Sequence, residues 1–98
     1  MATEITNDVD AKRYALRIDG QLASVLDYSI LGQAISLTHT YTQPPYRRRG
    51  LGADLVAFAI DDIDANTTLR IVPMCWFASD WFESHPERAY LLADRTPA

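Results

Sequence analysis

The chain has 98 residues, of which 48% are hydrophobic, and its formal net charge is −4 at pH 7. That length suffices for one domain with one hydrophobic core and leaves no room for a second. The acidic balance argues against general nucleic-acid binding, which usually needs a basic surface. We therefore expect residues 1–98 to form a single domain that binds no nucleic acid.

Cysteine content and hydropathy bear on the compartment. The single cysteine, Cys75, cannot form an intramolecular disulfide and gives no sign of an oxidising compartment. The first residues lack the basic segment and apolar run of an export signal, and no run of about 18 apolar residues could span a membrane. We expect a cytoplasmic protein without membrane contact.

The first half of the chain predicts a polar, flexible leader over residues 1–11, followed by three strands. Apolar residues recur at every second position of residues 13–18, as in a strand with one buried face. Asp19-Gly20 is typical of a hairpin turn, because both residues tolerate positive φ, and a second strand follows over residues 22–30. Short turns join these strands to a third, over residues 34–42, in an antiparallel meander. One face of the third strand should carry Ile35, Leu37, His39 and Tyr41.

The second half predicts a helix, a buried strand and two further helices. A helix over residues 50–65 follows from the helical spacing of Leu51, Leu55, Phe58, Ala59 and Ile63. The apolar run at residues 69–72 predicts a strand parallel to the third, because a strand–helix–strand crossover normally returns in that sense. A helix over residues 74–84 should be stopped by Pro86, with a last short helix over residues 87–93. The order β-β-β-α-β-α-α describes an α+β sandwich, with helices packed on a mixed, mainly antiparallel sheet.

A loop rich in arginine and glycine joins the third strand to the first helix. Three of the nine basic residues stand together as Arg47-Arg48-Arg49, and Gly50 and Gly52 follow at the start of the helix. The first amides of a helix lack intrahelical acceptors and carry the positive end of the helix dipole, so a glycine turn there can hold a phosphate. Arginines on the same turn add charge and forked donors. The loop therefore indicates an anion site, with a solvated turn as the alternative.

The spacing Arg47-x-x-Gly50-x-Gly52 resembles the pyrophosphate loop of the GNAT superfamily of acetyl-CoA-dependent acyltransferases. Five short stretches between Thr38 and Leu92 resemble, in the same order, segments of the small stand-alone proteins of that superfamily: His39-Thr40, Tyr46-Arg47, Gly50-Leu51-Gly52, Pro73-x-Cys75 and His85-Pro86-Glu87.

The resemblance implies acetyl-CoA as the cofactor. In the superfamily, the pantetheine arm of CoA lies in a gap between the third strand and the parallel strand that follows. That arm would run along Thr40, Tyr41 and Thr42, and the pyrophosphate would lie among Arg47, Arg48, Arg49, Gly50, Leu51, Gly52 and Ala53. Cys75 and Ser79 are further candidates for cofactor contact. No metal is expected, because two distant histidines and one cysteine lack the spacing of a zinc site.

Two residues are candidates for catalysis. Cys75 follows a strand and opens a helix, where the dipole favours a thiolate, although a lone cysteine is also a common small core residue. His39 could serve as general base for an acceptor amine, or could be a core or rim histidine. This sequence departs from the family pattern at three positions. Tyr41 stands where the family has a glutamate, and Arg48 stands where it usually has a glycine. Phe82 falls near the position at which the family often has a tyrosine that protonates the departing thiolate.

These features predict an N-acetyltransferase-like protein that binds acetyl-CoA and transfers acetyl to an unidentified amine, in a small molecule or a protein, by direct attack. The alternative, motivated by the short chain and the missing acid and base, is a non-catalytic acyl-CoA sensor, or a subunit whose acceptor site a protein partner completes. A third hypothesis is that the arginine turn binds another phosphate compound or RNA.

Overall fold

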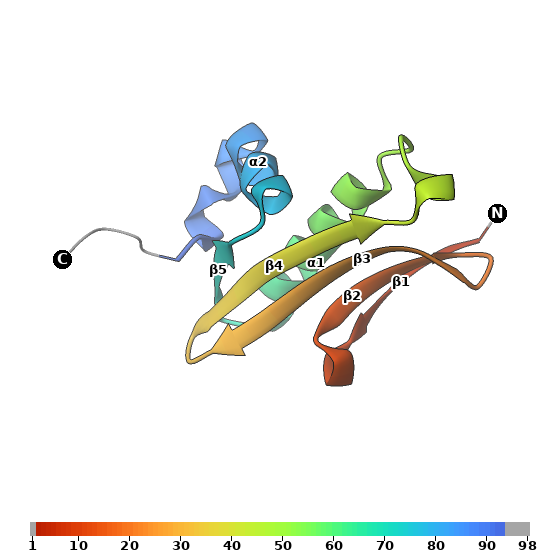
Figure 1. Ribbon diagram of the computed structural model, residues 1–98. Helices are drawn as coiled ribbons and strands as arrows, with labels where there is room; N and C mark the ends of the chain where they lie inside the picture. The colour runs from red at the N-terminus through yellow and green to blue at the C-terminus, as the bar shows by residue number, and fades with distance from the viewer. Residues whose placement is uncertain (1, 94–98) are drawn as a thin grey trace.

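Five strands form one sheet in the order β1-β2-β3-β4-β5 in the computed structural model, which describes residues 2–93 (Figure 1). Neighbouring strands are antiparallel, except for β4 and β5, which are parallel as predicted. The strands are β1 (Thr3–Asp8), β2 (Arg13–Ile18), β3 (Gln21–Leu31), β4 (Ala34–Thr42) and β5 (Arg70–Pro73).

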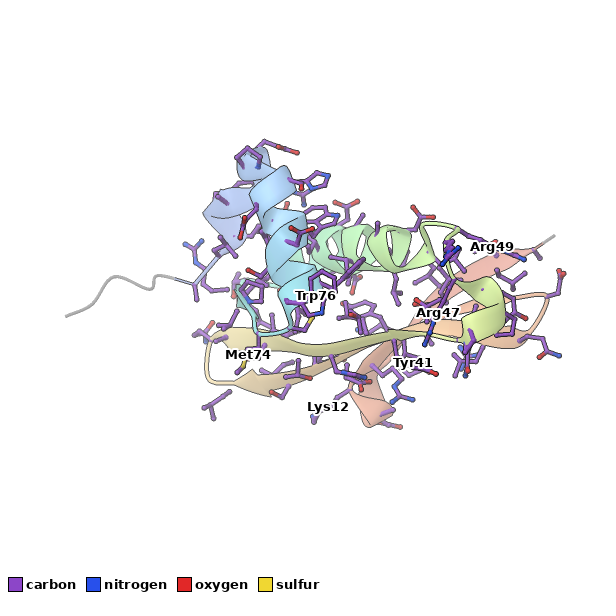
Figure 2. The ribbon with its side chains drawn as sticks, turned by 45° about the horizontal axis from the view of Figure 1, so that its top comes forward. Lys12, Tyr41, Arg47, Arg49, Met74 and Trp76 are labelled. Atoms are coloured by element: carbon purple, nitrogen blue, oxygen red, sulfur yellow. The ribbon has the colours of Figure 1, made fainter. Side chains whose placement is uncertain are left out.

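Two α-helices lie on the same side of this sheet (Figure 2). Helix α1 (Leu51–Asn66) connects β4 to β5, and α2 (Trp76–Ser84) follows β5. Short 3-10 helices are η1 (Val9–Ala11), η2 (Pro44–Tyr46) and η3 (Pro86–Leu91), of which η3 takes the place of the expected last helix. The α+β class and the mixed sheet with helices packed on it are thus confirmed. No helix within residues 2–93 is long and apolar enough to cross a membrane.

The expected flexible leader is wrong, because most of it forms the edge strand β1. This strand pairs antiparallel with β2, from Thr3 opposite Ile18 to Asp8 opposite Arg13. Side chains reinforce the pairing: the Arg17 guanidinium donates to the Thr6 hydroxyl at 3.1 Å and contacts the Asp8 carboxylate at 3.5 Å. An edge strand with polar residues on both faces has no hydrophobic alternation, so its sequence reads as a loop.

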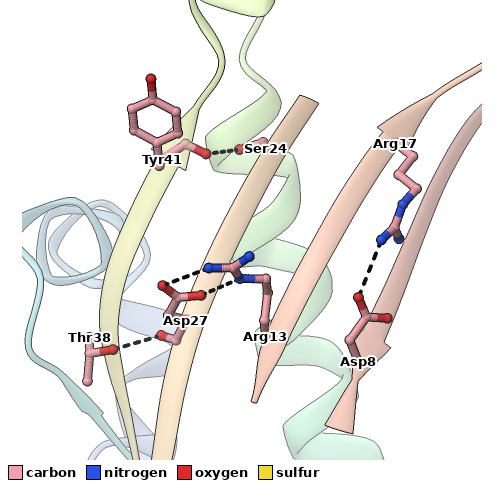
Figure 3. A network of polar contacts seen from close by, with 7 residues as sticks. All are labelled: Asp8, Arg13, Arg17, Ser24, Asp27, Thr38 and Tyr41. Atoms are coloured by element: carbon pink, nitrogen blue, oxygen red, sulfur yellow. Dashed lines mark hydrogen bonds and ion pairs between the residues drawn. The ribbon is translucent and has the colours of Figure 1, made fainter. Parts of the chain in front are cut away.

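A β-bulge at Thr38 divides β4 into two parts whose side chains face opposite ways. His39 pairs with Asp27 and Leu37 with Tyr28, so Thr38 is an extra residue without a partner. Since one extra residue reverses the alternation, the predicted face is wrong. Ile35 and Leu37 point into the core. Beyond the bulge, the half-buried Thr40 and Thr42 lie on the side of the sheet that carries the helices, whereas His39 and Tyr41 are exposed on the other side, next to Arg13 and Val25; Figure 3 shows Tyr41 on this side.

One hydrophobic core lies between the sheet and the two helices. Helix α1 buries one stripe completely or nearly so: Leu51, Leu55, Val56, Ala59, Ile60 and Ile63. Phe58, expected in this stripe, is 40% exposed and touches the ring of Tyr14 edge-on. Each large apolar side chain buried in this way contributes about 1.5–3 kcal/mol. This burial holds α1 against β2, β3 and β4 and thereby fixes the start of α1 beside the end of β4.

Three aspartates close to the C-terminal end of α1 oppose its dipole, and each has a donor from another element. The Tyr14 hydroxyl donates to Asp62 at 2.6 Å, and the Arg88 guanidinium donates to Asp61 at 2.8 Å. Asp64 accepts from the Tyr90 hydroxyl at 2.9 Å. These bonds tie β2 and η3 to the end of α1 and offset the unfavourable charge.

The loop from β4 to α1 contains two residues with positive φ. Arg48 has φ +68° and Gly50, the N-cap of α1, has φ +74°. Glycine adopts this region freely, whereas a residue with a Cβ pays about 1–2 kcal/mol. Arg48 therefore holds the chain in a conformation better suited to glycine.

Tyr14→Phe should weaken the alkaline sensitivity of the fold. Burial, followed by the bond to Asp62, raises the pKa of Tyr14 above its ordinary value of 10.0. The unfolded chain therefore loses this proton first as pH rises, so this contribution to stability is present below about pH 10 and is lost above it. Between pH 10 and 11 the unfolding free energy of the variant should fall less steeply than that of the parent. The two slopes should differ by up to about 1.4 kcal/mol per pH unit.

Urea denaturation at pH 7, 10 and 11 measures this effect. At pH 7 the variant should lose about 1 kcal/mol with the hydroxyl bond. The unfolding free energy of the variant should still fall somewhat above pH 10, because burial also raises the pKa of Tyr28. Equal slopes in the two proteins would contradict the assignment.

The variant Arg48→Gly should be more stable than the matched variant Arg49→Gly, because Arg48 has a positive φ in the parent protein and Arg49 does not. Both changes remove one charge and add the same flexibility to the unfolded chain. The difference combines the backbone strain at Arg48, about 1–2 kcal/mol, with the contact between Arg49 and the Tyr46 ring, about 0.5–1 kcal/mol at an exposed site, and should be at least about 1 kcal/mol in thermal or urea unfolding. A variant Arg48→Gly that is no more stable than Arg49→Gly would rule out strain in this turn.

Candidate functional site

A groove of about 510 Å³ opens between the end of β4, the start of α1 and the first turn of α2. Nine of the residues predicted to contact a cofactor line it: Thr40, Tyr41, Thr42, Arg47, Arg48, Gly50, Leu51, Gly52 and Ala53. Tyr46, Trp76 and Phe77 complete its wall. The structure therefore gathers the two predicted segments, strand end and arginine loop, into one site.

One wall of the groove is a free strand edge. β4 pairs with β5 only from Ala34 to Leu37, where the Leu37 carbonyl accepts from the amides of both Met74 and Cys75, at 3.0 and 3.1 Å. The chain then turns into α2, so within residues 2–93 the β5 side of residues 38–42 has no strand partner. Backbone groups on such an edge can bind an extended ligand in the manner of an added strand.

The opposite end of the groove is the N-terminus of α1. Gly50 provides no side-chain cap, and the first intrahelical bond runs from the Asp54 amide to the Gly50 carbonyl at 3.1 Å. The amides of Leu51, Gly52 and Ala53 therefore have no intrahelical acceptor. Together with the helix dipole, these three amides favour an anion at this point.

The three arginines of the loop have different positions, of which Figure 2 labels Arg47 and Arg49. Arg47 donates from Nε to the Thr42 carbonyl at 2.9 Å, and its guanidinium lies 5.4 Å from the centre of the Tyr41 ring. Arg47 and Arg48 line the groove, whereas Arg49 lies over the Tyr46 ring at 5.6 Å and does not line it. Two of the three predicted arginines are therefore placed to meet an anion in the groove.

Gly52 keeps the groove open beside an aromatic wall. A Cβ at this position would stand 3.1 Å from the ring of Phe77, closer than about nine in ten real Cβ contacts, so the ring would have to shift by a few tenths of an ångström. Trp76, 77% exposed, packs edge-on against Phe77 at the mouth of the groove. The sequence shows aromatic residues at the start of α2 but not that they face Gly52. The glycine at position 52 can be connected with Phe77 only once the positions of α1 and α2 are known.

Cys75 and Ser79 do not line the groove. The Cys75 thiol accepts from the Ala78 amide at 3.4 Å and so caps α2, and the side chain packs against the core. Ser79 lies one turn further along α2 and is half-buried. The local geometry gives Cys75 a structural role at the start of α2.

His39 lies apart from Cys75, on the opposite side of the sheet. It is exposed and lines a second cavity with Arg13 and Tyr41. The structure therefore does not bring the two predicted catalytic residues together in one site. The other histidine, His85, is the C-cap of α2, and its ring stacks on that of Trp81 with 3.9 Å between the ring centres. Residues 2–93 contain no group of three side chains arranged to hold a metal ion.

Three solved structures share this fold. A GCN5-like protein from Staphylococcus aureus is 17% identical, and the match covers 95% of this chain and 90% of that one, with a TM-score of 0.70. The ribosomal-protein-S18-alanine N-acetyltransferase from Escherichia coli is 24% identical over 74% of this chain, with a TM-score of 0.59. The ribosomal-protein-alanine N-acetyltransferase from Brucella melitensis biovar Abortus 2308 is 17% identical over 88% of this chain and 65% of that one, with a TM-score of 0.57.

The match spans about half, 49%, of the Escherichia coli enzyme. A comparison with curated protein sequences gave no match. The family model described as GCN5-related N-acetyl-transferase matches residues 13–91, from the start of β2 to the end of η3. The chain therefore belongs to the GCN5-related N-acetyltransferase family.

Proposed function

We propose that the groove binds acetyl-CoA and that the protein transfers the acetyl group to an amine, in the cytoplasm. The observation that carries this proposal is the meeting of two features in one groove: the free edge of β4 and the uncapped N-terminus of α1. An elongated ligand with an amide-containing arm and a pyrophosphate complements both features. No metal is part of the proposal.

Each part of the groove would hold a different part of such a ligand. The amides of Leu51, Gly52 and Ala53 would bind the pyrophosphate, with Arg47 and Arg48 neutralising its charge. The free edge of β4 beyond Leu37 would pair with the amides of pantetheine, which points the thioester toward the place where β4 and β5 separate. Gly52 leaves room for the chain between β4 and Phe77.

Bound acetyl-CoA would supply an activated acetyl group: the amine would attack the thioester carbonyl, a C–N bond would form, the C–S bond would break with CoA leaving as a thiolate, and the nitrogen would give its proton to water. The residues of the protein would act mainly by positioning, since no carboxylate or histidine lines the groove. Phe82 is buried at 5% exposure and cannot donate a proton, so the proton for the thiolate would come from water or from a tyrosine hydroxyl of the groove wall, Tyr41 or Tyr46. His39 remains a candidate base only for an amine that approaches from the other side of the sheet.

A non-catalytic acyl-CoA sensor, or a subunit completed by a protein partner, is the second candidate. It is favoured by the absence of any carboxylate or histidine among the groove residues. Release of free CoA in the presence of acetyl-CoA and a panel of amines, peptides and polyamines separates the two. Turnover by the isolated chain supports the enzyme, whereas tight binding without turnover supports the sensor.

Isothermal titration with acetyl-CoA tests the shared premise. The intact protein should bind in the micromolar range, and Arg47→Ala with Arg48→Ala should weaken binding at least tenfold, a loss of about 1.4 kcal/mol. The matched control is Arg17→Ala with Arg70→Ala, which removes the same charge at residues that do not line the groove. This control should bind within about threefold of the parent, a difference of under 1 kcal/mol. No binding at millimolar acetyl-CoA, or equal losses in the two variants, would refute the proposal.

A further inference from the structure

The arginines of the loop before α1 carry positive charge that no acidic side chain compensates. Within residues 2–93, none of Arg47, Arg48 and Arg49 forms an ion pair with a carboxylate, and this includes Asp54, the nearest acidic residue in sequence. Three arginines elsewhere each contact an aspartate: Arg13, Arg17 and Arg88. Arginine charge without a carboxylate partner is therefore concentrated at this loop.

Arg49 lies outside the groove but packs against its wall. Its guanidinium carbon is 5.6 Å from the centre of the Tyr46 ring, and Tyr46 lines the groove. Figure 2 shows Arg47 beside Tyr41, and Arg49 apart from both, near the start of α1. A guanidinium over an aromatic ring keeps its N–H donors available for another partner. Arg49 is thus a positioned donor just beyond the rim of the groove.

The backbone of the loop holds Arg49 next to the start of α1. The Tyr46 amide donates to the Gln43 carbonyl at 2.9 Å, and these residues enclose two prolines, which restrict backbone rotation. Arg49 directly precedes Gly50, the N-cap of α1. Its backbone is therefore held beside the uncapped amides that favour an anion.

The proposed ligand carries a phosphate beyond the two that the groove would bind. CoA has a pyrophosphate between pantetheine and adenosine, and a further phosphate on the 3′-oxygen of its ribose. Three amides of α1 and two arginines are available in the groove for the pyrophosphate. Because pantetheine would run along β4 toward Leu37, the nucleoside would leave the groove at the opposite end, past the loop that carries Arg49.

We propose that Arg49 binds the 3′-phosphate of CoA, and that it makes the protein select CoA thioesters over thioesters that lack this phosphate. This inference rests on the proposed function and gives the arginine outside the groove a task of its own. Arg49 is exposed, so the contact should change affinity by a factor of about five, and not by orders of magnitude.

Isothermal titration with CoA and with 3′-dephospho-CoA tests this contact, because the two ligands differ only in the 3′-phosphate. The parent protein should bind CoA at least about fivefold more tightly than 3′-dephospho-CoA. In Arg49→Gln this preference should fall below about twofold, because CoA binds more weakly while 3′-dephospho-CoA binds as before. Arg49→Lys, which keeps the charge without the forked donors, should retain part of the preference.

Two control variants separate this contact from general effects of charge. Arg48→Gln removes a charge inside the groove, so it should weaken both ligands by similar factors. Lys12→Gln removes a charge from an exposed residue that does not line the groove. It should leave both affinities within about twofold of the parent at about 0.1 M salt, where exposed charges more than about 10 Å apart are largely screened.

The outcomes distinguish this inference from the proposed function. If the parent binds both ligands equally well, or if Arg49→Gln weakens both by the same factor, as a merely structural contact with Tyr46 would, the 3′-phosphate contact is wrong while the proposed function stands. A preference for CoA that Arg48→Gln removes and Arg49→Gln leaves unchanged would also overturn the role of Arg49. If the parent binds neither ligand at millimolar concentration, both proposals are refuted.

Discussion

The separation of β4 from β5 after Leu37 is the constraint on which the functional surface depends. Four residues of parallel pairing end where the Leu37 carbonyl accepts two successive amides, and the chain then enters α2. Continued pairing would satisfy the outer backbone groups of residues 38–42 and close the groove. Because the strands part, a row of backbone groups faces the first turns of α1 and α2, and one ligand can contact all three elements.

The bulge at Thr38 gives the two faces of β4 different tasks. Before it, Ile35 and Leu37 belong to the core. After it, Thr40 and Thr42 face the groove, and His39 and Tyr41 face the open side of the sheet. One inserted residue thus moves a histidine and a tyrosine from the predicted core face to a second cavity on the open side. The same strand then lines the groove on one side and this cavity on the other, with Tyr41 common to both.

Polar side chains lie at both ends of α1, which borders the groove. The aspartates of α1 find donors in Tyr14, Arg88 and Tyr90, so the helix keeps its length without exposing uncompensated charge at its negative end. Arg48 does carry backbone strain, at φ +68°. That strain stands directly before the uncapped amides of α1, where an arginine lines the groove. Here a local conformational cost coincides with a positively charged residue that lines the groove.

The sequence by itself determined the order and sense of β2 to β5, the helix after the arginine loop and the gathering of arginine and glycine at the start of that helix. Those features rest on local patterns, namely period-two and helical spacing, turn residues and clustered charge. Only the tertiary structure decided that β1 forms, although polar residues stand on both of its faces; which way His39 and Tyr41 face, which a single bulge reverses; and the approach of Phe77 to Gly52. It also separated Cys75 from His39. Each of these depends on pairing or packing between residues distant in the chain, which no local pattern encodes.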